Sequence, residues 1–453
     1  MTISGYAEYT ESGIPWLGAI PSDWQLLPFF SRFSERKISN KGMKCNNLLS
    51  LSYGRIVNKD ITTLDGLLPA SFETYQIVHI DDIVFRLTDL QNDKKSLRSA
   101  IVSEKGIITS AYLAVVVHKF DAAFSSYLFR AYDLMKVFYS MGGGLRQSMK
   151  YDDMKWLMIA APTVNEQAQI ARFLDYETAK IDILIQEQKR LIDLLKEKRQ
   201  AVISRAVTKG LDPDVPTKDS GVKWLGEIPA HWQLKRLKQV TSQIIDGAHF
   251  TPTYVDTGIP FIRVKDIQST KINMEEIKRI PEDEHAELIK RCNPAKGDIL
   301  LSKNGTIGLT KIVDWDFQFS IFVSLCLIKS TSEISSEFLE KVLSSDFASE
   351  QFRDLGQKTS VTNLHLEKIR EMIVLLPTIA EQSRICSFVD VETAKLALLS
   401  TEALKGIALL KERRSALVSA AVTGKIDVRN WQPPADKSTF NEGARQAGLE
   451  AEA

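Results

Sequence analysis

The sequence repeats itself, and this repetition limits the folds open to the chain. The segment SGIPWLGAIPSDWQL (Ser12–Leu26) returns as SGVKWLGEIPAHWQL (Ser220–Leu234), with ten of fifteen residues identical. The offset of 208 residues is far longer than the roughly 20–50 residues of solenoid repeats, so it indicates a duplicated domain. A length of 453 residues also exceeds the usual size of one hydrophobic core, which agrees with two domains.

Two further segments recur at an offset of 215 residues. PTVNEQAQIARFLDYETAK (Pro162–Lys180) returns as PTIAEQSRICSFVDVETAK (Pro377–Lys395), with eleven of nineteen residues identical. LLKEKRQAVISRAVTKGLD (Leu194–Asp212) returns as LLKERRSALVSAAVTGKID (Leu409–Asp427), again with eleven of nineteen. We expect the recurring segments to serve one structural purpose twice.

Between these segments the two copies differ. Only short stretches of sequence are similar between residues 27 to about 145 and residues 235 to about 360. One such pair is DDIVF (Asp81–Phe85) and GDILL (Gly297–Leu301). Short β-branched or aromatic runs bounded by turn residues predict strands in both, for example YQIVHIDDIVF, GIITSAYLAVVV, IPFIRVKDI and FSIFVSLCLI. SSYLFRAYDLMKVFYS and SSEFLEKVLSSDFASEQFRDL predict an amphipathic helix at matching positions, so each varied segment is expected to be mixed α/β.

The recurring segments predict two long helices, Glu166–Thr208 and Glu381–Thr423. Their apolar residues recur at steps of three, four or seven, as in a coiled-coil seam. Gly210 and Gly424 stand where each helix should end. Helices of this length favour packing against each other. The predicted seam residues are Ile170, Leu174, Ile181, Leu184, Leu191, Leu195 and Val202 in the first helix, and Ile385, Val389, Leu396, Leu399, Ala403, Leu410 and Leu417 in the second.

Composition excludes several classes of protein. The chain is 44% hydrophobic and 25% charged, as in ordinary globular proteins, and no window is apolar enough for a membrane span. No signal peptide is recognised. Four widely spaced cysteines and six scattered histidines argue against disulfides and metal sites and favour a cytoplasmic protein. The net charge is +1, but residues 30–160 hold 18 Lys and Arg against 13 Asp and Glu, which suits nucleic acid or an ordinary mixed surface.

Catalytic motifs are missing. The sequence has neither a phosphate-binding G-x-x-x-x-G-K-[ST] loop nor a G-x-S-x-G nucleophile elbow. WQPPAD (Trp431–Asp436) departs from the Asp/Asn-Pro-Pro-aromatic motif of amino-methyltransferases. The glycines of MGGGLRQ (Met141–Gln147) are expected in a mobile loop rather than in a cofactor-binding turn.

The order of recurring phrases resembles the specificity subunit of Type I restriction-modification enzymes. W-L-G-x-I-P opens each copy, P-T-x-x-E-Q-x-x-I-x-x-F closes it, and each long helix ends in AVTKG or AVTGK. The resemblance covers residues 1 to about 430. It implies two α/β target recognition domains joined by two long antiparallel coiled-coil-like helices with pseudo-two-fold symmetry. The predicted parts are residues 1–161 (first recognition domain), 162–212 (central helix), 213–376 (second recognition domain), 377–427 (distal helix) and 428–453 (polar tail, expected to be disordered).

The resemblance also implies a function. In this family each recognition domain reads one half of a bipartite, asymmetric DNA site. The helices set the spacing of the half-sites and dock two adenine-N6 methyltransferase subunits, to which two restriction subunits can add. The chain itself is expected to be non-catalytic, because S-adenosylmethionine, ATP and Mg²⁺ belong to the partner subunits. The tryptophans of the opening phrase are interpreted as packing anchors rather than as base-stacking platforms.

Candidate DNA-binding residues are polar and basic side chains in predicted loops, since base edges and phosphates are bound by such groups. In the first copy the loops are RLTDLQNDKKSLR and GGGLRQSMK; in the second, DGAHFTPTY and SKNGTIG, which resemble recurring family loops, and QKTSVTN. An ordinary surface role is an alternative for each residue. The candidates are Arg86, Lys94, Lys95, Arg98, Arg146, Gln147, Lys150, His249, Thr251, Lys303, Asn304, Thr306, Lys358 and Asn363.

Two other interpretations stay open at this point. The chain could be a self-contained restriction-methylation enzyme, although the motifs for it are missing. It could instead be a coiled-coil scaffold that binds only protein partners. An assay of methyl transfer by the purified chain tests the first alternative, and DNA binding by the assembled complex tests the second.

Overall fold

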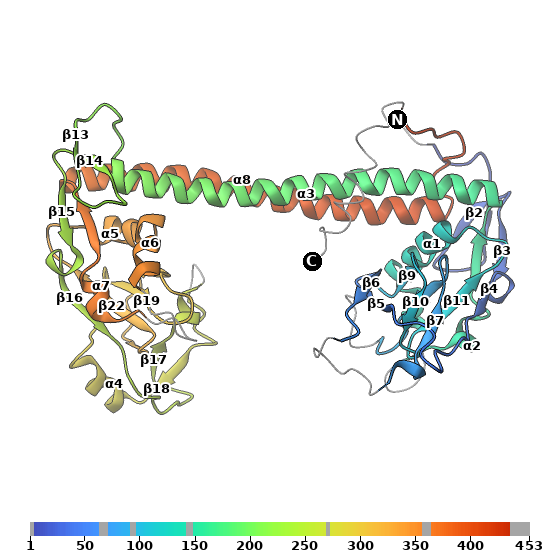
Figure 1. Cartoon of the computed structure of the whole chain (residues 1–453), viewed down its shortest axis with the longest axis horizontal. Helices are drawn as coiled ribbons and strands as arrows, with labels where there is room; N and C mark the ends of the chain where they lie inside the picture. Colours follow the sequence, from blue (N-terminus) through green and yellow to red (C-terminus); the bar gives the residue numbers. More distant parts are fainter. Residues whose placement is uncertain are drawn as a thin grey trace. The chain divides into compact units, whose positions relative to one another are not determined.

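The computed structural model describes residues 4–62, 71–90, 97–141, 148–268, 272–355 and 364–434. The chain divides into two compact units. Unit 1 comprises Met1–Arg190 and Ala403–Ala453, and unit 2 comprises Leu191–Glu402. The long helices α3 (Val164–Lys209) and α8 (Ile379–Val422) each give one half to each unit (Figure 1).

Unit 1 is mixed α/β, as predicted. Strand β1 pairs with β2 and β3 with β12, and two four-stranded sheets have the orders β4-β11-β8-β9 and β6-β5-β10-β7. Its elements before α3 are β1 (Tyr9–Glu11), β2 (Ala19–Pro21), β3 (Gln25–Pro28), β4 (Phe33–Glu35), β5 (Leu48–Ser52), β6 (Arg55–Lys59), β7 (Gln76–Val78), β8 (Ile83–Phe85), β9 (Ser99–Ile101), β10 (Gly106–Ile108), β11 (Leu113–Val117), α1 (Ala122–Leu134), α2 (Tyr151–Met154) and β12 (Met158–Ala161).

Unit 2 has the same kind of architecture. Strand β13 pairs with β14 and β15 with β23, one sheet has the order β16-β22-β19-β20, and another has the order β18-β17-β21. Its elements between the long helices are β13 (Thr217–Asp219), β14 (Glu227–Pro229), β15 (Gln233–Arg236), β16 (Thr241–Asp246), β17 (Ile259–Ile262), β18 (Lys278–Ile280), α4 (Glu282–Ile289), β19 (Ile299–Ser302), β20 (Thr310–Ile312), β21 (Ser320–Ile321), β22 (Leu325–Ser330), α5 (Ser336–Leu343), α6 (Asp346–Leu355), α7 (Leu366–Arg370) and β23 (Ile373–Leu376).

The varied segments share one four-stranded sheet despite their different sequences. The sheet order β4-β11-β8-β9 in unit 1 corresponds strand for strand to β16-β22-β19-β20 in unit 2. The short match between Asp81–Phe85 and Gly297–Leu301 marks equivalent strands, β8 and β19. Both strands are buried, so part of the match reflects core positions filled mainly by apolar residues.

The recurring glutamine of the E-Q pair joins each long helix to its own unit. Gln167 accepts a hydrogen bond from the backbone N of Asp121 (2.8 Å) and donates one to the carbonyl of Pro162 (2.8 Å). Gln382 repeats both bonds, accepting from Ser335 N (2.8 Å) and donating to Pro377 O (3.1 Å). Asp121 and Ser335 are the N-caps of α1 and α5, so the same side chain fixes the start of an equivalent helix in each unit.

The tryptophans of the opening phrase differ in burial. Trp24 and Trp232 are 6% and 0% exposed, which confirms their prediction as packing anchors. Trp16 is partly buried and its ring packs on Tyr132 at 4.6 Å. Trp224 is 45% exposed, although its ring lies 5.5 Å from that of Phe347. The second tryptophan of each phrase is therefore the stronger anchor.

The long helices confirm the prediction, and their ends lie within two residues of the expected bounds. Gly210 and Gly424 follow the helices with φ of +75° and +73°, the left-handed conformation that glycine adopts at a helix C-terminus. Within unit 1 the first half of α3 packs on the last half of α8 through an ion pair of 3.2 Å between Asp182 and Arg414.

The predicted seam is only partly correct. Ile170, Leu174 and Ile181 are buried, but Leu184 and Leu191 are 43% and 42% exposed. Leu399 of the second helix is 53% exposed. In the first helix burial shifts to neighbouring positions such as Ile185, because a straight helix with 3.6 residues per turn drifts away from a strict heptad stripe.

Two further expectations need correction. Residues 335–355 form two helices, α5 and α6, because the hydroxyl of Ser345 donates to Val342 O at the end of α5 and accepts from Ala348 N in α6. The tail predicted to be disordered from residue 428 is packed at its start, since Val428 is 1% exposed and Trp431 lies against α3.

No described helix is long and apolar enough to cross a membrane. Among the described residues, no group of His, Cys, Asp and Glu could hold a metal ion.

Candidate nucleic-acid interface

Equivalent loops carry the candidate residues in both units. RLTDLQNDKKSLR connects β8 to β9, and SKNGTIG connects the equivalent strands β19 and β20. The backbone N of Met149 donates to Leu87 O (2.9 Å), and that of Leu364 donates to Lys303 O (3.0 Å). These two bonds bring the chain just before α2 and just before α7 against the corresponding loop. In each unit the residues just before this short helix therefore lie against the loop that joins the two equivalent strands.

Asp246 is the centre of the loop cluster in unit 2. It ends β16 and is 3% exposed. Its carboxylate accepts hydrogen bonds from Lys303 Nζ (3.0 Å), His249 Nε2 (2.9 Å) and Arg291 Nη2 (2.6 Å). Burial by itself would raise the pKa of Asp246, but these hydrogen bonds and the charge of Lys303 lower it to about 2. Asp246 is therefore ionised at neutral pH and holds DGAHFTPTY against SKNGTIG.

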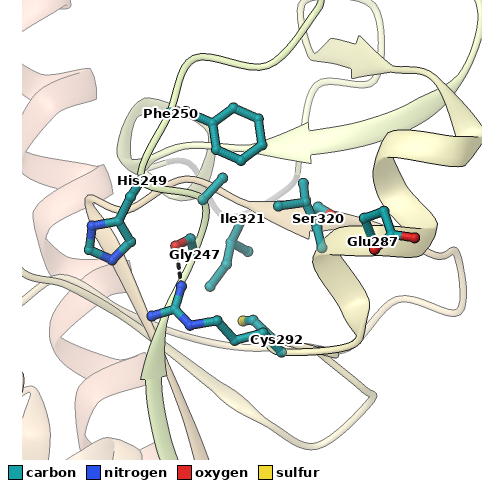
Figure 2. Close-up of a pocket in the computed structure, with 10 residues that line it drawn as sticks. Gly247, His249, Phe250, Glu287, Cys292, Ser320 and Ile321 are labelled. Atoms are coloured by element: carbon teal, nitrogen blue, oxygen red, sulfur yellow. Dashed lines mark hydrogen bonds between the residues drawn. The ribbon is translucent and has the colours of Figure 1, made fainter.

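The turn after Asp246 requires glycine. A Cβ atom on Gly247 would lie 1.9 Å from the carbonyl oxygen of Ile321, which no side chain can tolerate. Arg291 also donates to Gly247 O (3.3 Å), the bond drawn as a dashed line to the labelled Gly247 in Figure 2, so one guanidinium holds both the carboxylate and the turn. The fixed turn leaves the side chain of His249 59% exposed and Phe250 54% exposed, beside a pocket of about 210 Å³.

The SKNGTIG loop is closed on itself. The Ser302 hydroxyl donates to Thr306 O and accepts from Leu309 N (2.9 Å), and Gly308 N donates to Ser302 O (3.0 Å). Thr306 is exposed at the tip. Asn304 is partly buried, and its Oδ1 has no hydrogen-bond partner among the described residues. This oxygen is itself buried, so it is not open to a base edge.

In unit 1, Arg98 supports the fold from the interior. It is fully buried, and its guanidinium donates to the carbonyls of Arg86 (3.4 Å), Thr88 (2.8 Å) and Asp89 (3.4 Å). Its own backbone N donates to Asp133 (2.8 Å), and burial raises the pKa of that carboxyl. Arg98 therefore closes the base of the β8–β9 loop. We no longer expect it to contact DNA directly, because none of its surface faces solvent.

A family model described as the Type I restriction modification DNA specificity domain matches residues 229–405, which cover most of unit 2 and the beginning of unit 1's share of α8. The chain also matches curated specificity subunits of Type I restriction enzymes. Residues 229–405 therefore match a domain of this family, and the chain as a whole is similar to Type I specificity subunits.

Its similarity to individual relatives is distant. The MjaVIII specificity subunit of Methanocaldococcus jannaschii is 23% identical over 354 residues, 75% of this chain and 78% of the relative. The EcoBI specificity subunit of Escherichia coli is 25% identical over 303 residues, 65% of this chain and 63% of the relative.

Solved structures share the fold. A structure reported for complex assembly and conformational transition of the type I R-M system superposes with a TM-score of 0.65 at 15% identity, covering 89% of this chain and 98% of that one. The HsdS subunit from Thermoanaerobacter tengcongensis gives 0.51 at 15% identity, covering 92% and 100%. At this identity the likeness shows the fold alone.

The candidate DNA-binding residues of the chain differ in how exposed they are. Lys150, His249, Thr251 and Thr306 are exposed, and Arg86 and Asn304 are partly buried. Lys303 is 6% exposed, and its ammonium binds Asp246, so it organises the loop cluster rather than facing solvent. The candidates outside the described residues are Lys94, Lys95, Arg146, Gln147, Lys358 and Asn363.

Sequence reasoning missed Arg291 and Phe250. Arg291 lies just beyond α4, 45 residues from Asp246, and no motif surrounds it. Only the folded chain brings it to the Asp246 turn. Phe250 stands inside DGAHFTPTY and could have been selected, since exposed aromatic rings stack on nucleic-acid bases.

Proposed function

We propose that this chain is the non-catalytic DNA-recognition subunit of a Type I restriction-modification complex. Each unit reads one half of a bipartite, asymmetric DNA site with its loop cluster. The observation behind the proposal is that the two units have equivalent loops with different surface residues. The β8–β9 loop of unit 1 and the β19–β20 loop of unit 2 lie at corresponding ends of two equivalent sheets. One topology with two sets of side chains suits the reading of two different sequences.

Partners supply the chemistry in this proposal. The long helices dock two methyltransferase subunits, and two restriction subunits add to that complex. S-adenosylmethionine, ATP and Mg²⁺ bind to these partners. A scaffold that binds proteins alone is not favoured, because it would not need polar loops held by buried charged side chains, Arg98 in unit 1 and the Asp246–Lys303 pair in unit 2.

DNA binding by the assembled complex tests the proposal. Methylome sequencing of cells that carry the complex identifies the methylated site, and fluorescence anisotropy then compares this duplex with a scrambled one. We expect a preference of at least about 10³ for the methylated site. Equal affinity for both duplexes would contradict the proposal, and methyl transfer by the purified chain alone would contradict its non-catalytic role.

Domain exchange tests the independence of the two units. Replacing residues 27–160 with the matching segment of a relative should change one half-site and leave the other intact. The exchanged segment contributes no residue to the Asp246 cluster of unit 2. A change in both half-sites would show that the two units do not read DNA separately.

A further inference from the structure

Unit 1 has a strained turn at an exposed position. Ser52 pairs with Arg55 at the end of the β5–β6 hairpin, so the turn consists of Tyr53 and Gly54 alone. Both residues have positive φ, +44° and +78°, as a type I′ turn requires. Asparagine or aspartate usually takes the first position, because a bulky side chain is strained in the left-handed region. Tyr53 is 63% exposed, so burial of its ring does not compensate for this strain.

An arginine from a distant helix fixes the turn. Arg130 of α1 donates from Nη2 to the carbonyl of Gly54 (2.5 Å) and to that of Ser99 (3.4 Å). A Cβ atom on Gly54 would lie 2.3 Å from this nitrogen, so any other residue would displace the guanidinium. Leu51 in the stem of the hairpin is 4% exposed and packs in the core of unit 1. Tyr53 therefore stands on a rigid support.

The turn lies beside the candidate DNA-binding loop of unit 1. Ser99 is the first residue of β9 and directly follows Arg98, which closes the β8–β9 loop. Arg130 therefore joins the tip of the hairpin to the point where that loop ends. In agreement with this contact, β6 lies next to β9 and α1 packs on β9 (Figure 1).

The same connection differs between the two units. In both units one strand pairs antiparallel with the next strand and parallel with a later one: β5 with β6 and β10, and β17 with β18 and β21. The antiparallel strands are joined by the two-residue turn in unit 1 and by residues 263–277 in unit 2. A connection that varies on a common arrangement of strands suits the reading of two different sequences.

The composition of the hairpin favours DNA as its ligand. Residues 48–59 contain Arg55 and Lys59 and neither Asp nor Glu, so their charge suits phosphates. The major groove admits a two-stranded β-ribbon. An aromatic ring cannot neutralise a phosphate, but it can pack on the apolar groups of bases, such as the thymine methyl, or stack on a base. Tyr53, at the tip, is the hairpin residue best placed for such a contact.

We propose that Tyr53 is a specificity-determining residue of unit 1, whose ring contacts the bases of one half-site in the major groove. This inference rests on the proposed function, because that function supplies the DNA. It adds the β5–β6 turn to unit 1 as a reading element beside the β8–β9 loop. It also explains why a residue that is unfavourable for the turn occupies its first position.

The variant Tyr53→Asn separates the role of the ring from that of the turn, because asparagine is favoured at this position. The full chain should unfold at a higher temperature with this change. In the assembled complex, affinity for the recognised duplex should nevertheless fall roughly tenfold to a hundredfold by fluorescence anisotropy. Affinity for a scrambled duplex and the slope of log affinity against log salt should not change, since no phosphate contact is lost. Methylome sequencing should find one half-site relaxed and the other intact.

Ile80→Asn is the matched control. Ile80 belongs to the same unit and is 61% exposed, but it precedes β8 and so lies at the other end of that strand from the β8–β9 loop. This variant should bind the recognised duplex and the scrambled duplex as wild type does.

Other results would overturn the inference. If wild type prefers its site and Tyr53→Asn prefers it equally, Tyr53 does not determine specificity, although the proposed function stands. An equal loss on both duplexes with a smaller salt slope would make Tyr53 a contact to the DNA backbone. Loss of complex assembly in native mass spectrometry would assign Tyr53 to a protein partner, and a lower unfolding temperature would assign its ring to the fold. If wild type itself shows no preference, the proposed function and the inference both fail.

Discussion

The indole Nε1 of Trp232 donates a hydrogen bond of 3.0 Å to Glu381, in the first turn of α8. Unit 1 repeats the contact, since Trp24 Nε1 donates to Glu166 in the first turn of α3 (3.1 Å). A Cβ atom on Gly210 would touch the Trp232 ring at 3.3 Å, so the indole also packs on the end of α3. Each copy of the opening phrase therefore joins the start of one long helix to the end of the other within its own unit.

Replacing Trp232 with phenylalanine should lower stability. The variant Trp232→Phe keeps most of the apolar surface but leaves Glu381 without the indole donor, for a loss of about 1–2 kcal/mol. Thermal unfolding of the full chain measures this change, and hydrogen exchange should locate it at the end of α3 and the start of α8. Trp224→Phe is the matched control, because Trp224 belongs to the same phrase and is 45% exposed. Equal effects of both variants would argue against the hydrogen bond as the cause.

The Asp246 cluster should make unit 2 sensitive to acid. The pKa of Asp246 is lowered to about 2 in the folded chain, against about 3.9 for an unperturbed aspartate. The ionised carboxylate therefore stabilises the fold above about pH 4, and this contribution is lost as the pH falls toward 2. Denaturant unfolding between pH 2 and 6 should show the loss in wild type and not in Asp246→Asn. An identical pH dependence in both proteins would contradict the prediction.

Removing Asp246 should also be costly at neutral pH. Asp246→Asn leaves the buried ammonium of Lys303 without a counter-charge, which typically costs about 3–5 kcal/mol. The double variant Asp246→Asn/Lys303→Met removes both charges and should recover much of that loss. Unfolding free energies of the single and double variants measure the coupling. Additive losses would show that the two side chains do not act as a pair.

Lys150 and Arg98 should respond differently in DNA binding. Lys150 is exposed, and Lys150→Ala should reduce the slope of log affinity against log salt by about one if the ammonium contacts a phosphate. Arg98→Met should leave this slope unchanged and instead destabilise unit 1 by about 1–3 kcal/mol, because methionine cannot replace the guanidinium bonds to the loop carbonyls. Salt titrations of the assembled complex separate the two roles. A reduced slope in Arg98→Met would restore it as a DNA contact.

If the long helices set the spacing of the half-sites, lengthening them should widen the gap. An insertion after Gly210 would not lengthen α3, because the helix ends at Lys209 and Gly210 is left-handed. Seven helical residues should instead be inserted in both helices, after Arg190 in α3 and after Glu402 in α8. They add roughly 10 Å, or about three base pairs at about 3.4 Å each. Methylome sequencing should find both half-sites unchanged and the gap widened; an unchanged gap with full activity would contradict this role.

Much of the fold could be predicted because its signals are local. The long helices follow from periodic apolar residues and a terminal glycine, and the strands follow from short β-branched runs between turn residues. The loops that carry Lys150, His249 and Thr306 could be selected from their polar composition. Arg291 could not be selected, since its contact with Asp246 depends on a chain reversal that no short motif describes.

By itself, the sequence determined the duplication, the two long helices and the α/β character of the varied segments. Only the tertiary structure decided which side of each long helix is buried: Ile185 is inside and Leu184 outside, although both are apolar. It also decided that Arg98 closes a loop from the interior and that Trp431 covers Phe173 while Phe388 stays open. The physical reason is that secondary structure depends on neighbours along the chain, whereas burial and pairing depend on residues brought together from distant positions.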